Sequence, residues 1–473
     1  MKRIFTLLLF FVAAIGIQAQ QDFIMYNWHD VPQSGYSNPS NRFNGKFYIG
    51  LPGLSSNYFS LSNSGFSYTD AVKKSGDSLL LDFNSLISAL EDKNYLSFQT
   101  KIDILSFGIT LGEKSQLTFN ITENANFRFS YTKDFIDFIH KGNAAFADNV
   151  ANSEGVGISL NHYRECGIGL SHQLTEKLRL GARAKYLYGM ENVYSKKTDM
   201  SLRTDPVTFD LTAKADIEIQ TAGFHEVDDD ESGSTYAFGR NNTGMGLDLG
   251  GHYQFSEKLS FNASIIDLGF ISWNDYTKSY SIENGEYTYD GIEISAFTVE
   301  NGQGDGDDGD TSFDRILDSL EEDFKLVETE EAYNSPLTAR FYAGANYQLN
   351  QSTMVSGVVQ SEIFQSQILP SFTGAINHRL TKWITVGASY TVIHRSFDNL
   401  GLGLSIDPGP VQLYIVSDNV LGAIQPQNAR FVQVRFGINL IFGRDKSREF
   451  HPPHKAVSID RKARTKDKEE EVP

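Results

Sequence analysis

Apolar side chains occupy every second position along much of the chain. The stretch Gly169–Leu187 shows the pattern well, with two alternating limbs on either side of the polar turn Thr175–Lys177. The apolar positions of its second limb are Leu178, Leu180, Ala182, Ala184 and Tyr186. A period of two places alternate side chains on opposite faces of a β-strand. Because the turn is so short, the two predicted strands have to pair antiparallel.

The same hairpin pattern recurs three more times along the chain. The repeats are Gly250–Leu268, Gly344–Ile363 and Gly374–Ile393, each with a short polar turn at its centre. Repeated hairpins joined by short turns on one side are typical of an up-and-down β-barrel. We therefore predict an all-β fold, a transmembrane antiparallel barrel of about 14 strands, with 12 to 16 compatible with the pattern. Helical periodicity at Leu79–Leu90 and Asp134–His140 predicts short helices in its loops.

Charged residues fall on the polar phase of two of these strands. One set is Arg179, Arg183 and Lys185 in the hairpin described above. The other follows the longest alternating stretch, Val207–Thr221, and consists of Asp210, Lys214, Asp216 and Glu218. In a barrel with a lipid-facing apolar row, the opposite row faces the lumen. We expect these charges to line a polar pathway there or to pair across strands and lock the wall.

The N-terminus has the features of an export signal. Lys2 and Arg3 precede the apolar run Ile4–Ile17, and Ala19 supplies a small residue for cleavage, so residues 1–19 are predicted to be a signal peptide. The run is short for a membrane anchor, and no later stretch approaches the roughly 20 apolar residues of a transmembrane helix. A mean hydropathy of −0.31 fits a wall that is apolar on one face only. The expected location is the outer membrane of a Gram-negative cell.

The remaining chain divides into three parts. Residues 20–44 lack sustained alternation but carry aromatic side chains. We expect them to fold into the lumen as an N-terminal plug, or hatch, with a disordered leader as the alternative. Residues 45–443 are the predicted barrel. Residues 444–473 are rich in charge and are expected to form a disordered periplasmic tail. Short turns are predicted on the periplasmic side, with the long acidic loops outside.

The sequence offers little support for catalysis, metal binding or nucleic-acid binding. A net charge of −18 argues against nucleic acid as a partner. The single cysteine, Cys166, excludes an intramolecular disulfide, and no His-Glu-x-x-His or Gly-x-Ser-x-Gly motif is present. Four carboxylates at Asp305, Asp307, Asp308 and Asp310 have a density that Ca²⁺ favours, but they lack the spacing of an EF-hand. We expect a solvated loop there, no metal, no cofactor and no enzymatic activity, with a Ser-His pair on the wall as the alternative.

Several segments carry a resemblance to a known group of proteins. They are YIGLPGLSSNYFSLSNSGFSYTD (48–70), YRECGIGLSHQLTEKLRLGARAKYLYGMENV (163–193), LSFNASIIDLGFISW (259–273) and GLGLSIDPGPVQLYIVSDNV (401–420). These resemble an uncharacterised family of Bacteroidota outer-membrane barrels, a domain of unknown function. That family is distantly similar to FadL-like transporters and to the PorV and PorP/SprF-like proteins of type IX secretion.

The resemblance carries implications for architecture and activity. FadL-like proteins imply 14 strands with an N-terminal hatch, and Asn38-Pro39 is similar to their Asn-Pro-Ala, with Ser40 in place of the Ala. Tyr26, Trp28, Asn38 and Pro39 would then be hatch residues. The first hypothesis is passive binding and uptake of small hydrophobic or amphipathic compounds. The alternatives are a docking barrel for protein secretion and a general diffusion channel. The expected partners are outer-membrane lipid, a hydrophobic small molecule, and a secretion-system or cargo protein.

Overall fold

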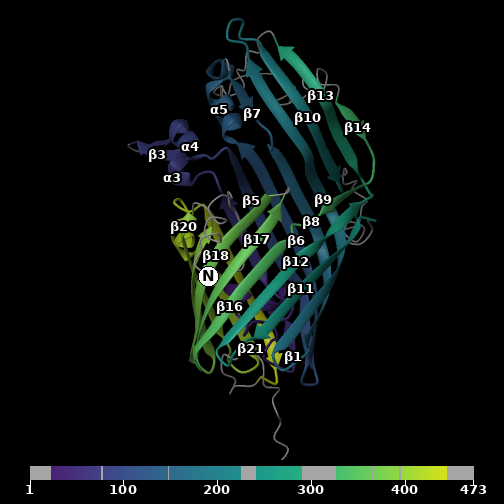
Figure 1. Ribbon diagram of the computed structural model, residues 1–473, viewed down its shortest axis with the longest axis vertical. Coiled ribbons are helices and arrows are strands. Elements are labelled where there is room, and N and C mark those ends of the chain that lie inside the picture. Colours follow the sequence, from purple (N-terminus) through teal and green to yellow (C-terminus); the bar gives the residue numbers. More distant parts are fainter. Residues whose placement is uncertain are drawn as a thin grey trace, which may run out of the picture.

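The computed structural model describes residues 23–75, 78–147, 149–224, 241–289, 326–364, 367–393 and 396–444. They form a closed antiparallel barrel of 14 strands (Figure 1). The wall consists of β1 (Phe47–Gly50) continued by β2 (Asn57–Asn63), β5 (Lys93–Leu111), β6 (Ser115–Thr132), β8 (Gly157–Gln173), β9 (Leu178–Thr204), β11 (Thr243–Gln254), β12 (Leu259–Trp273), β15 (Tyr333–Pro336) continued by β16 (Arg340–Asn350), β17 (Thr353–Phe364), β18 (Gln367–Thr381), β19 (Ile384–Ile393), β20 (Ser396–Ile406), β21 (Val411–Ser417) and β22 (Phe431–Phe442). The predicted fold and strand number are confirmed.

The ring closes between its first and last strands. β22 pairs with β1 and β2, and both of these pair in turn with β5. All four hairpins predicted from the sequence are present, as β8–β9, β11–β12, β16–β17 and β18–β19. Closure leaves no free sheet edge along the wall, which removes the usual route to edge-to-edge aggregation.

The two faces of the wall have opposite chemistry. On β9, Leu180 and Tyr186 are exposed on the outside, whereas Arg183 and Lys185 are buried. The same alternation exposes apolar side chains around the ring, among them Ile104, Ile168, Leu249, Phe261, Phe341, Val359, Ile376, Tyr390, Leu402, Ile415 and Phe436. An apolar outer face over a polar interior is the arrangement of a membrane-spanning barrel and the reverse of a water-soluble one.

A group of charged side chains lies on the outer face of β6 and β8. On β6 and β8, Glu123 accepts hydrogen bonds from His162 Nε2 at 2.9 Å and Arg164 Nε at 2.8 Å. Toward the short-turn end of the same strands, Ile168 and Leu170 are exposed. Charged side chains are costly at the lipid-facing midplane but not at the interface. Exposed apolar side chains resume beyond these charges, at Ile158 of β8 and Phe98 of β5, so the charged group interrupts the apolar face without ending it.

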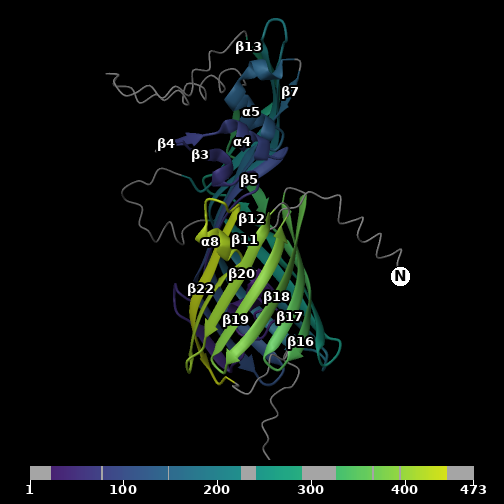
Figure 2. The ribbon, with the colours of Figure 1, turned by 90° about the vertical axis from the view of Figure 1, so that its left-hand side faces the viewer.

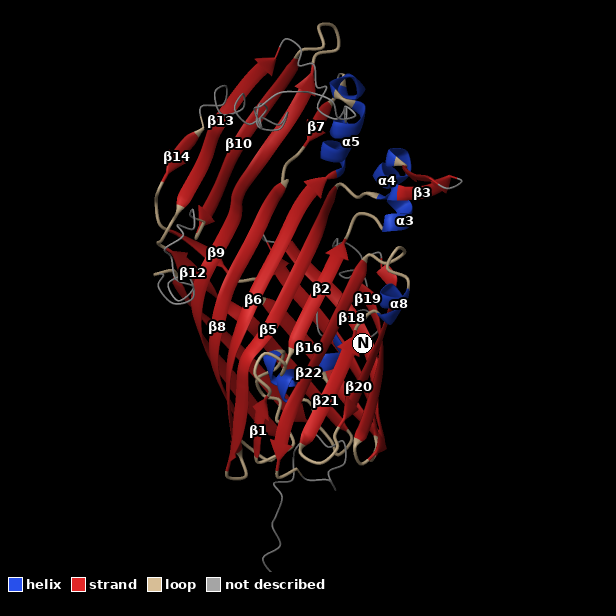
Figure 3. Cartoon of the chain, turned by 180° about the vertical axis from the view of Figure 1, so that it is seen from behind, coloured by secondary structure: helices blue, strands red, loops and turns tan. Residues whose placement is uncertain are grey.

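A sheet extends beyond the ring at the end that carries the long loops (Figures 1 and 3). The upper half of β9 pairs there with β7 (Val150–Asn152) and β10 (Leu211–Ala222), and β10 pairs with β13 (Lys278–Tyr289), which pairs with β14 (Val327–Thr329). The sequence predicted Val207–Thr221 as a wall strand, and this is wrong. Strand β10 lies in the extension, and Val207 and Phe209 belong to the preceding turn, where Phe209 has a φ of 62°.

Short helices lie at the same end of the barrel (Figure 2). They are α3 (Tyr68–Ala71), α4 (Phe83–Ala89), α5 (Lys133–Lys141), η2 (Asn143–Phe146) and α8 (Val420–Ile424), and β3 (Val72–Ser75) and β4 (Ser78–Leu81) form a hairpin between α3 and α4. The helix predicted at Asp134–His140 is α5. That predicted at Leu79–Leu90 begins later, because Asp82 caps α4 through Ser85 N and the preceding leucines form β4. Among the described residues, no helix has the length and apolar character needed to cross a membrane.

The first described residues lie inside the ring. We call residues 23–44 the inner segment; it contains α2 (Phe23–Tyr26) and η1 (Pro32–Tyr36). Figure 3 shows these two helices enclosed by the strands. Most of the segment is buried, Phe23 and Val31 completely. The predicted signal peptide and all of the predicted tail after Arg444 lie outside the described residues.

Candidate functional site

The inner segment is held by polar contacts from strands on different sides of the ring. The backbone N–H groups of Phe23 and Ile24 donate to Asp418, just after β21, at 3.1 and 3.0 Å. Gln33 and Asn439 of β22 exchange two side-chain hydrogen bonds of 2.9 Å. Two more contacts reach β5 and β18, from Tyr36 Oη to Asp103 at 2.7 Å and from Asp30 to Arg379 at 3.0 Å. The segment therefore crosses the lumen.

Glycines in the wall make room for the inner segment. A Cβ added at Gly403 would lie 1.9 Å from the Trp28 ring, and one at Gly250 would lie 2.1 Å from Asn38 Oδ1. At Gly181 the same atom would lie 2.2 Å from the Pro39 backbone. Because a real Cβ cannot approach that closely, these positions require glycine. The structure thus places Trp28, Asn38 and Pro39 directly against the wall.

Two further contacts fix the remaining residues named from the sequence. The ring of Tyr26 stacks on Tyr342 with centroids 4.8 Å apart. Ser40, which stands where the resembling proteins have Ala, donates from its Oγ to Asn38 Oδ1 at 2.7 Å. The serine therefore stabilises the turn that carries Pro39 instead of disrupting it.

A chain of buried charges begins on β9 beside the inner segment. The Arg183 guanidinium lies 4.6 Å from the Tyr36 ring and 3.8 Å from Asp248. Lys185 Nζ lies 2.8 Å from Asp248, 2.5 Å from Asp267 and 3.4 Å from Glu165. The third residue of this set, Arg179, is fully buried nearer the short turns.

The chain of charges continues across β12, β16 and β17. Arg340 Nη1 lies 2.8 Å from Asp267 and its Nε 3.5 Å from Glu362. Glu362 also accepts a 2.6 Å contact from Arg128 of β6. Positively and negatively charged side chains thus alternate along this series, in the order Arg128, Glu362, Arg340, Asp267, Lys185, Asp248 and Arg183. Most of these pairs join neighbouring strands, and the pair of Arg128 and Glu362 links β6 and β17, which are not neighbours in the ring.

A bulge in β12 brings Asp267 into this chain. The register between β11 and β12 shifts beside Asp248, and Asp267 has a φ of 60°, which is unusual for a residue other than glycine. Its N–H donates to Asp248 Oδ1 at 2.8 Å. Two carboxylates therefore converge on one lysine. Sequence reasoning missed both, although Asp248 lies on the polar phase between Leu247 and Leu249.

The second predicted set of lumen charges lies elsewhere. Lys214 pairs with Glu286 of β13 at 3.2 Å, Glu218 with Lys196 of β9 at 2.7 Å, and Asp216 with Lys197. Asp210 accepts a hydrogen bond from Thr208 in the turn before β10. All four residues belong to the extension, so their assignment to the lumen is corrected.

We expect the pair formed by Lys197 and Asp216 to contribute little to stability. The Lys197 side chain is exposed, and ion pairs in water gain little because solvent screens them. Replacing Lys197 with Met should leave the urea midpoint of the folded barrel unchanged within error. Urea titration followed by tryptophan fluorescence measures this. A clear drop in the midpoint would show that the extension supports the ring.

A cavity of about 100 Å³ lies at the long-loop side of the buried charges. We call it the vestibule. Arg128, Asp267, Arg340 and Glu362 contribute charge to its lining, and Tyr163 and Leu337 contribute apolar surface. Asparagine and glutamine side chains complete the polar part, namely Gln99, Asn126, Asn161 and Asn192. The vestibule is thus lined by charged, neutral polar and apolar groups together.

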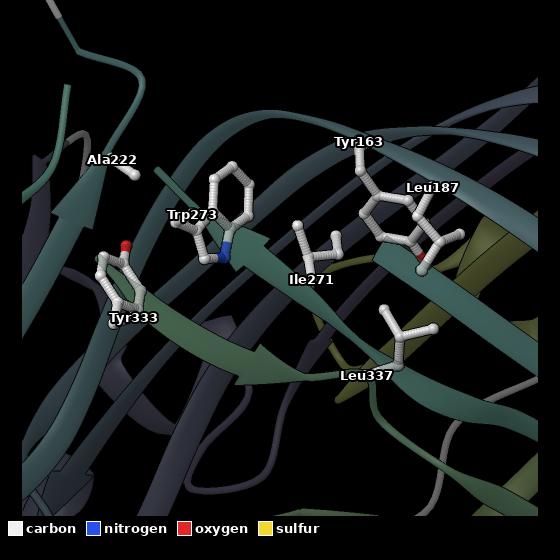
Figure 4. Close-up of a cluster of buried hydrophobic side chains, with 7 residues drawn as sticks. All are labelled: Tyr163, Leu187, Ala222, Ile271, Trp273, Tyr333 and Leu337. Carbon is white, nitrogen blue, oxygen red and sulfur yellow. The ribbon is translucent and has the colours of Figure 1, made fainter. Parts of the chain in front are cut away.

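The apolar side of the vestibule belongs to a buried cluster (Figure 4). Its members come from β8, β9, β10, β12 and the β15 region, and they are Tyr163, Leu187, Ala222, Ile271, Trp273, Tyr333 and Leu337. Their polar atoms are satisfied, because Trp273 Nε1 donates to Ser335 at 2.9 Å and Tyr333 Oη to Asn192 at 2.8 Å. The cluster therefore forms the apolar side of the vestibule, beside its charged residues.

No metal site emerges from the part of the chain that the structure describes, since no three His, Cys, Asp or Glu residues there are grouped to hold an ion. The calcium candidates Asp305, Asp307, Asp308 and Asp310 lie outside the described residues. Cys166 is partly exposed and lies on the outward phase of β8.

A polar interior, an apolar outer face and a closed ring of strands define a transmembrane β-barrel, here with its own N-terminal segment inside. The chain belongs to a family of unknown function, DUF5723, which matches residues 39–418. The comparison with curated proteins finds no match.

Among solved structures, the chain is similar to several barrels at low identity. A Pseudomonas aeruginosa FadL homologue is 9% identical over 90% of this chain and 98% of that one, with a TM-score of 0.40. The Ralstonia pickettii toluene transporter TbuX is 11% identical over 88% and 95%, with a TM-score of 0.35. The Pseudomonas putida toluene transporter TodX is 9% identical over 90% and 98%, with a TM-score of 0.36.

Proposed function

We propose that the protein is an outer-membrane barrel that binds small amphipathic molecules from outside and admits them passively, with residues 20–44 as a hatch. The observation that carries this proposal is the vestibule, which lies over a lumen occupied by the inner segment. In this proposal the signal peptide directs export, the short turns face the periplasm and the vestibule faces outward.

The lining of the vestibule favours an amphipathic ligand over a purely hydrophobic one. Binding sites for hydrophobic molecules are mainly apolar with a few polar groups. Here one side carries Arg340, Glu362 and Asp267, and the other carries Tyr163 and Leu337. A molecule with a charged or zwitterionic head and a short apolar body satisfies both sides.

The contacts of the hatch suit a segment that shifts. Besides apolar packing of side chains such as Phe23 and Trp28 against the wall, its attachment consists of individual hydrogen bonds and an ion pair. Examples are the contacts of Gln33 with Asn439 and of Asp30 with Arg379. Each hydrogen bond contributes a net ~1 kcal/mol, because water replaces the lost partner when the bond breaks. Rearranging a few of them opens a path without unfolding the wall.

A fluorescent amphiphile tests ligand binding directly. Energy transfer from Trp273, which adjoins the vestibule, to 11-(dansylamino)undecanoate should report binding by the purified barrel in lipid vesicles. Leu337→Asp places a charge on the apolar side and should weaken affinity about tenfold or more, since a buried leucine contributes roughly 1.5–3 kcal/mol. The matched control is Leu349→Asp at the short-turn end of β16, which should bind as the wild type does. Equal affinity in both variants would contradict the proposal.

A docking role for secreted proteins is the second candidate. The observation favouring it is the extension, because β10, β13 and β14 are not needed to close the ring. Val327 of β14 is exposed, and strands at a sheet margin can add a partner strand. Purification from native membranes with a stoichiometric secreted protein bound to the extension, and no amphiphile binding, would favour this role.

A further inference from the structure

The hairpin β3–β4 exposes three consecutive leucines. Leu79, Leu80 and Leu81 are 66%, 53% and 53% exposed. Successive residues of a strand point to opposite faces, so both faces of this two-stranded ribbon are apolar along β4. Contiguous apolar surface of this kind on a water-exposed element usually marks an interaction site.

The neighbouring elements do not need these leucines for their own packing. A separate buried cluster joins α3 and α4 to β6 through Ala71, Leu86, Ile87, Leu90 and Tyr131. The hairpin projects away from it, to the side of the barrel, in both Figures 1 and 2. The hairpin therefore extends away from the barrel axis.

The hairpin stands above the rim of the membrane-facing wall. Its base is tied to the rim, because Thr69 N donates to the Gln427 carbonyl at 3.0 Å and Arg430 lies 3.4 Å from Asp70. Helix α8 lies on this rim, on the same side as the hairpin (Figure 3), and exposes Leu421 at 46% and Ile424 at 70%. Exposed apolar side chains also lead up to the hairpin on the two strands that it connects, at Leu61 of β2 and at Leu96 and Phe98 of β5.

Basic residues accompany the leucines. Lys73 and Lys74 of β3 face Leu80 and Leu79 across the hairpin. Lys73 is engaged with Asp82, and this hydrogen bond lowers the pKa of Asp82 to about 2. Lys74 is exposed beside Leu79. Apolar side chains flanked by a lysine that reaches toward water are typical of elements that lie in a lipid interface, where the lysine meets anionic headgroups.

We propose that Leu79–Leu81, together with Leu421 and Ile424, form a membrane flange that inserts into the outer leaflet beside the barrel, with Lys74 at anionic headgroups. The flange extends the lipid contact of the wall to one side of the rim. It anchors α3 and α4, and through Asp70 and Arg430 the top of β22, at a fixed height relative to the membrane.

Quenching by spin-labelled lipid tests this proposal. In a Cys166→Ala background, an environment-sensitive fluorophore is attached to Leu80→Cys, and the barrel is placed in phosphatidylcholine vesicles with phosphatidylglycerol and a lipid carrying nitroxide near the headgroup. Ile168→Cys on the wall, at 55% exposure, is the positive control. Val207→Cys in the β9–β10 turn, at 82% exposure, is the negative control. We expect quenching at Leu80 of at least half that at Ile168, and none above background at Val207.

The outcomes show whether lipid, water or protein surrounds the leucines of the flange. A label at Leu80 that is as unquenched and water-exposed as the one at Val207 overturns the proposal. A buried label that lipid does not quench also overturns it, because a protein segment then covers the leucines. Lys74→Glu should lower the quenching about twofold in anionic vesicles and leave it unchanged in pure phosphatidylcholine. Heat-modifiable migration on gels verifies that each variant is folded.

Discussion

Removing residues 23–43 is expected to turn the barrel into an open pore. The inward face of the wall is polar, with Ser106, Asn120 and Asn377 among its buried residues. Barrels of 8 strands are filled by their own side chains, whereas those of 16–18 strands hold an aqueous channel. A ring of 14 strands falls between these limits, and here the inner segment occupies the space. Without it, we expect sugars to enter proteoliposomes at least about tenfold faster.

Liposome swelling in isosmotic sugar measures this opening. A matched control replaces Leu79, Leu80 and Leu81 with Ser, which alters the outside of the barrel and should leave swelling at the wild-type rate. Wild-type protein that swells as fast as the deletion would favour the diffusion channel over a hatch. A folded deletion variant that admits no sugar would show that some other part of the chain closes the lumen.

The alternation of side chains was sufficient to predict the wall. A period of two identifies a strand and separates its faces, so the four hairpins and the inward position of Arg183 and Lys185 follow from local pattern alone. The same reasoning failed for Val207–Thr221. That stretch alternates as a lipid-facing strand does, but in the structure β10 pairs above the ring with β9 and β13. Alternation fixes the face of a side chain and not its height along the barrel axis.

The partners of the buried charges could not be predicted from local pattern. Lys185 meets Asp248 and Asp267 because non-local register aligns β9, β11 and β12. Asp267 reaches the interior through a bulge that interrupts the alternation of β12, so its phase in the sequence is misleading. The vestibule is likewise assembled from segments as distant as Ser97 and Glu362. The pairing of strands that are distant in sequence therefore determines how the site is assembled. The local sequence pattern indicates only which residues are available for it.

Replacing Lys185 with Met is expected to destabilise the barrel strongly. Lys185 is the cation that both Asp248 and Asp267 approach within 2.8 Å, and all three are buried. Methionine fills a similar volume but leaves Asp267 with Arg340 alone, and Asp248 with only the longer 3.8 Å contact to Arg183. Breaking a buried ion pair by removing one partner costs about 3–5 kcal/mol, because the remaining charge is desolvated and uncompensated. The free energy of unfolding, from urea titration in lipid vesicles, should fall by that amount.

A second substitution distinguishes charge from packing as the cause. Combining Lys185→Met with Asp248→Asn removes one of the two carboxylates that have lost the lysine. The other, Asp267, keeps its 2.8 Å contact with Arg340. The double variant should therefore recover more than half of the lost stability. If Lys185→Met destabilises the barrel and Asp248→Asn restores nothing, the lysine acts through its packing. If neither variant differs from the wild type, the chain of charges does not lock the wall, and its role is confined to the lining of the vestibule.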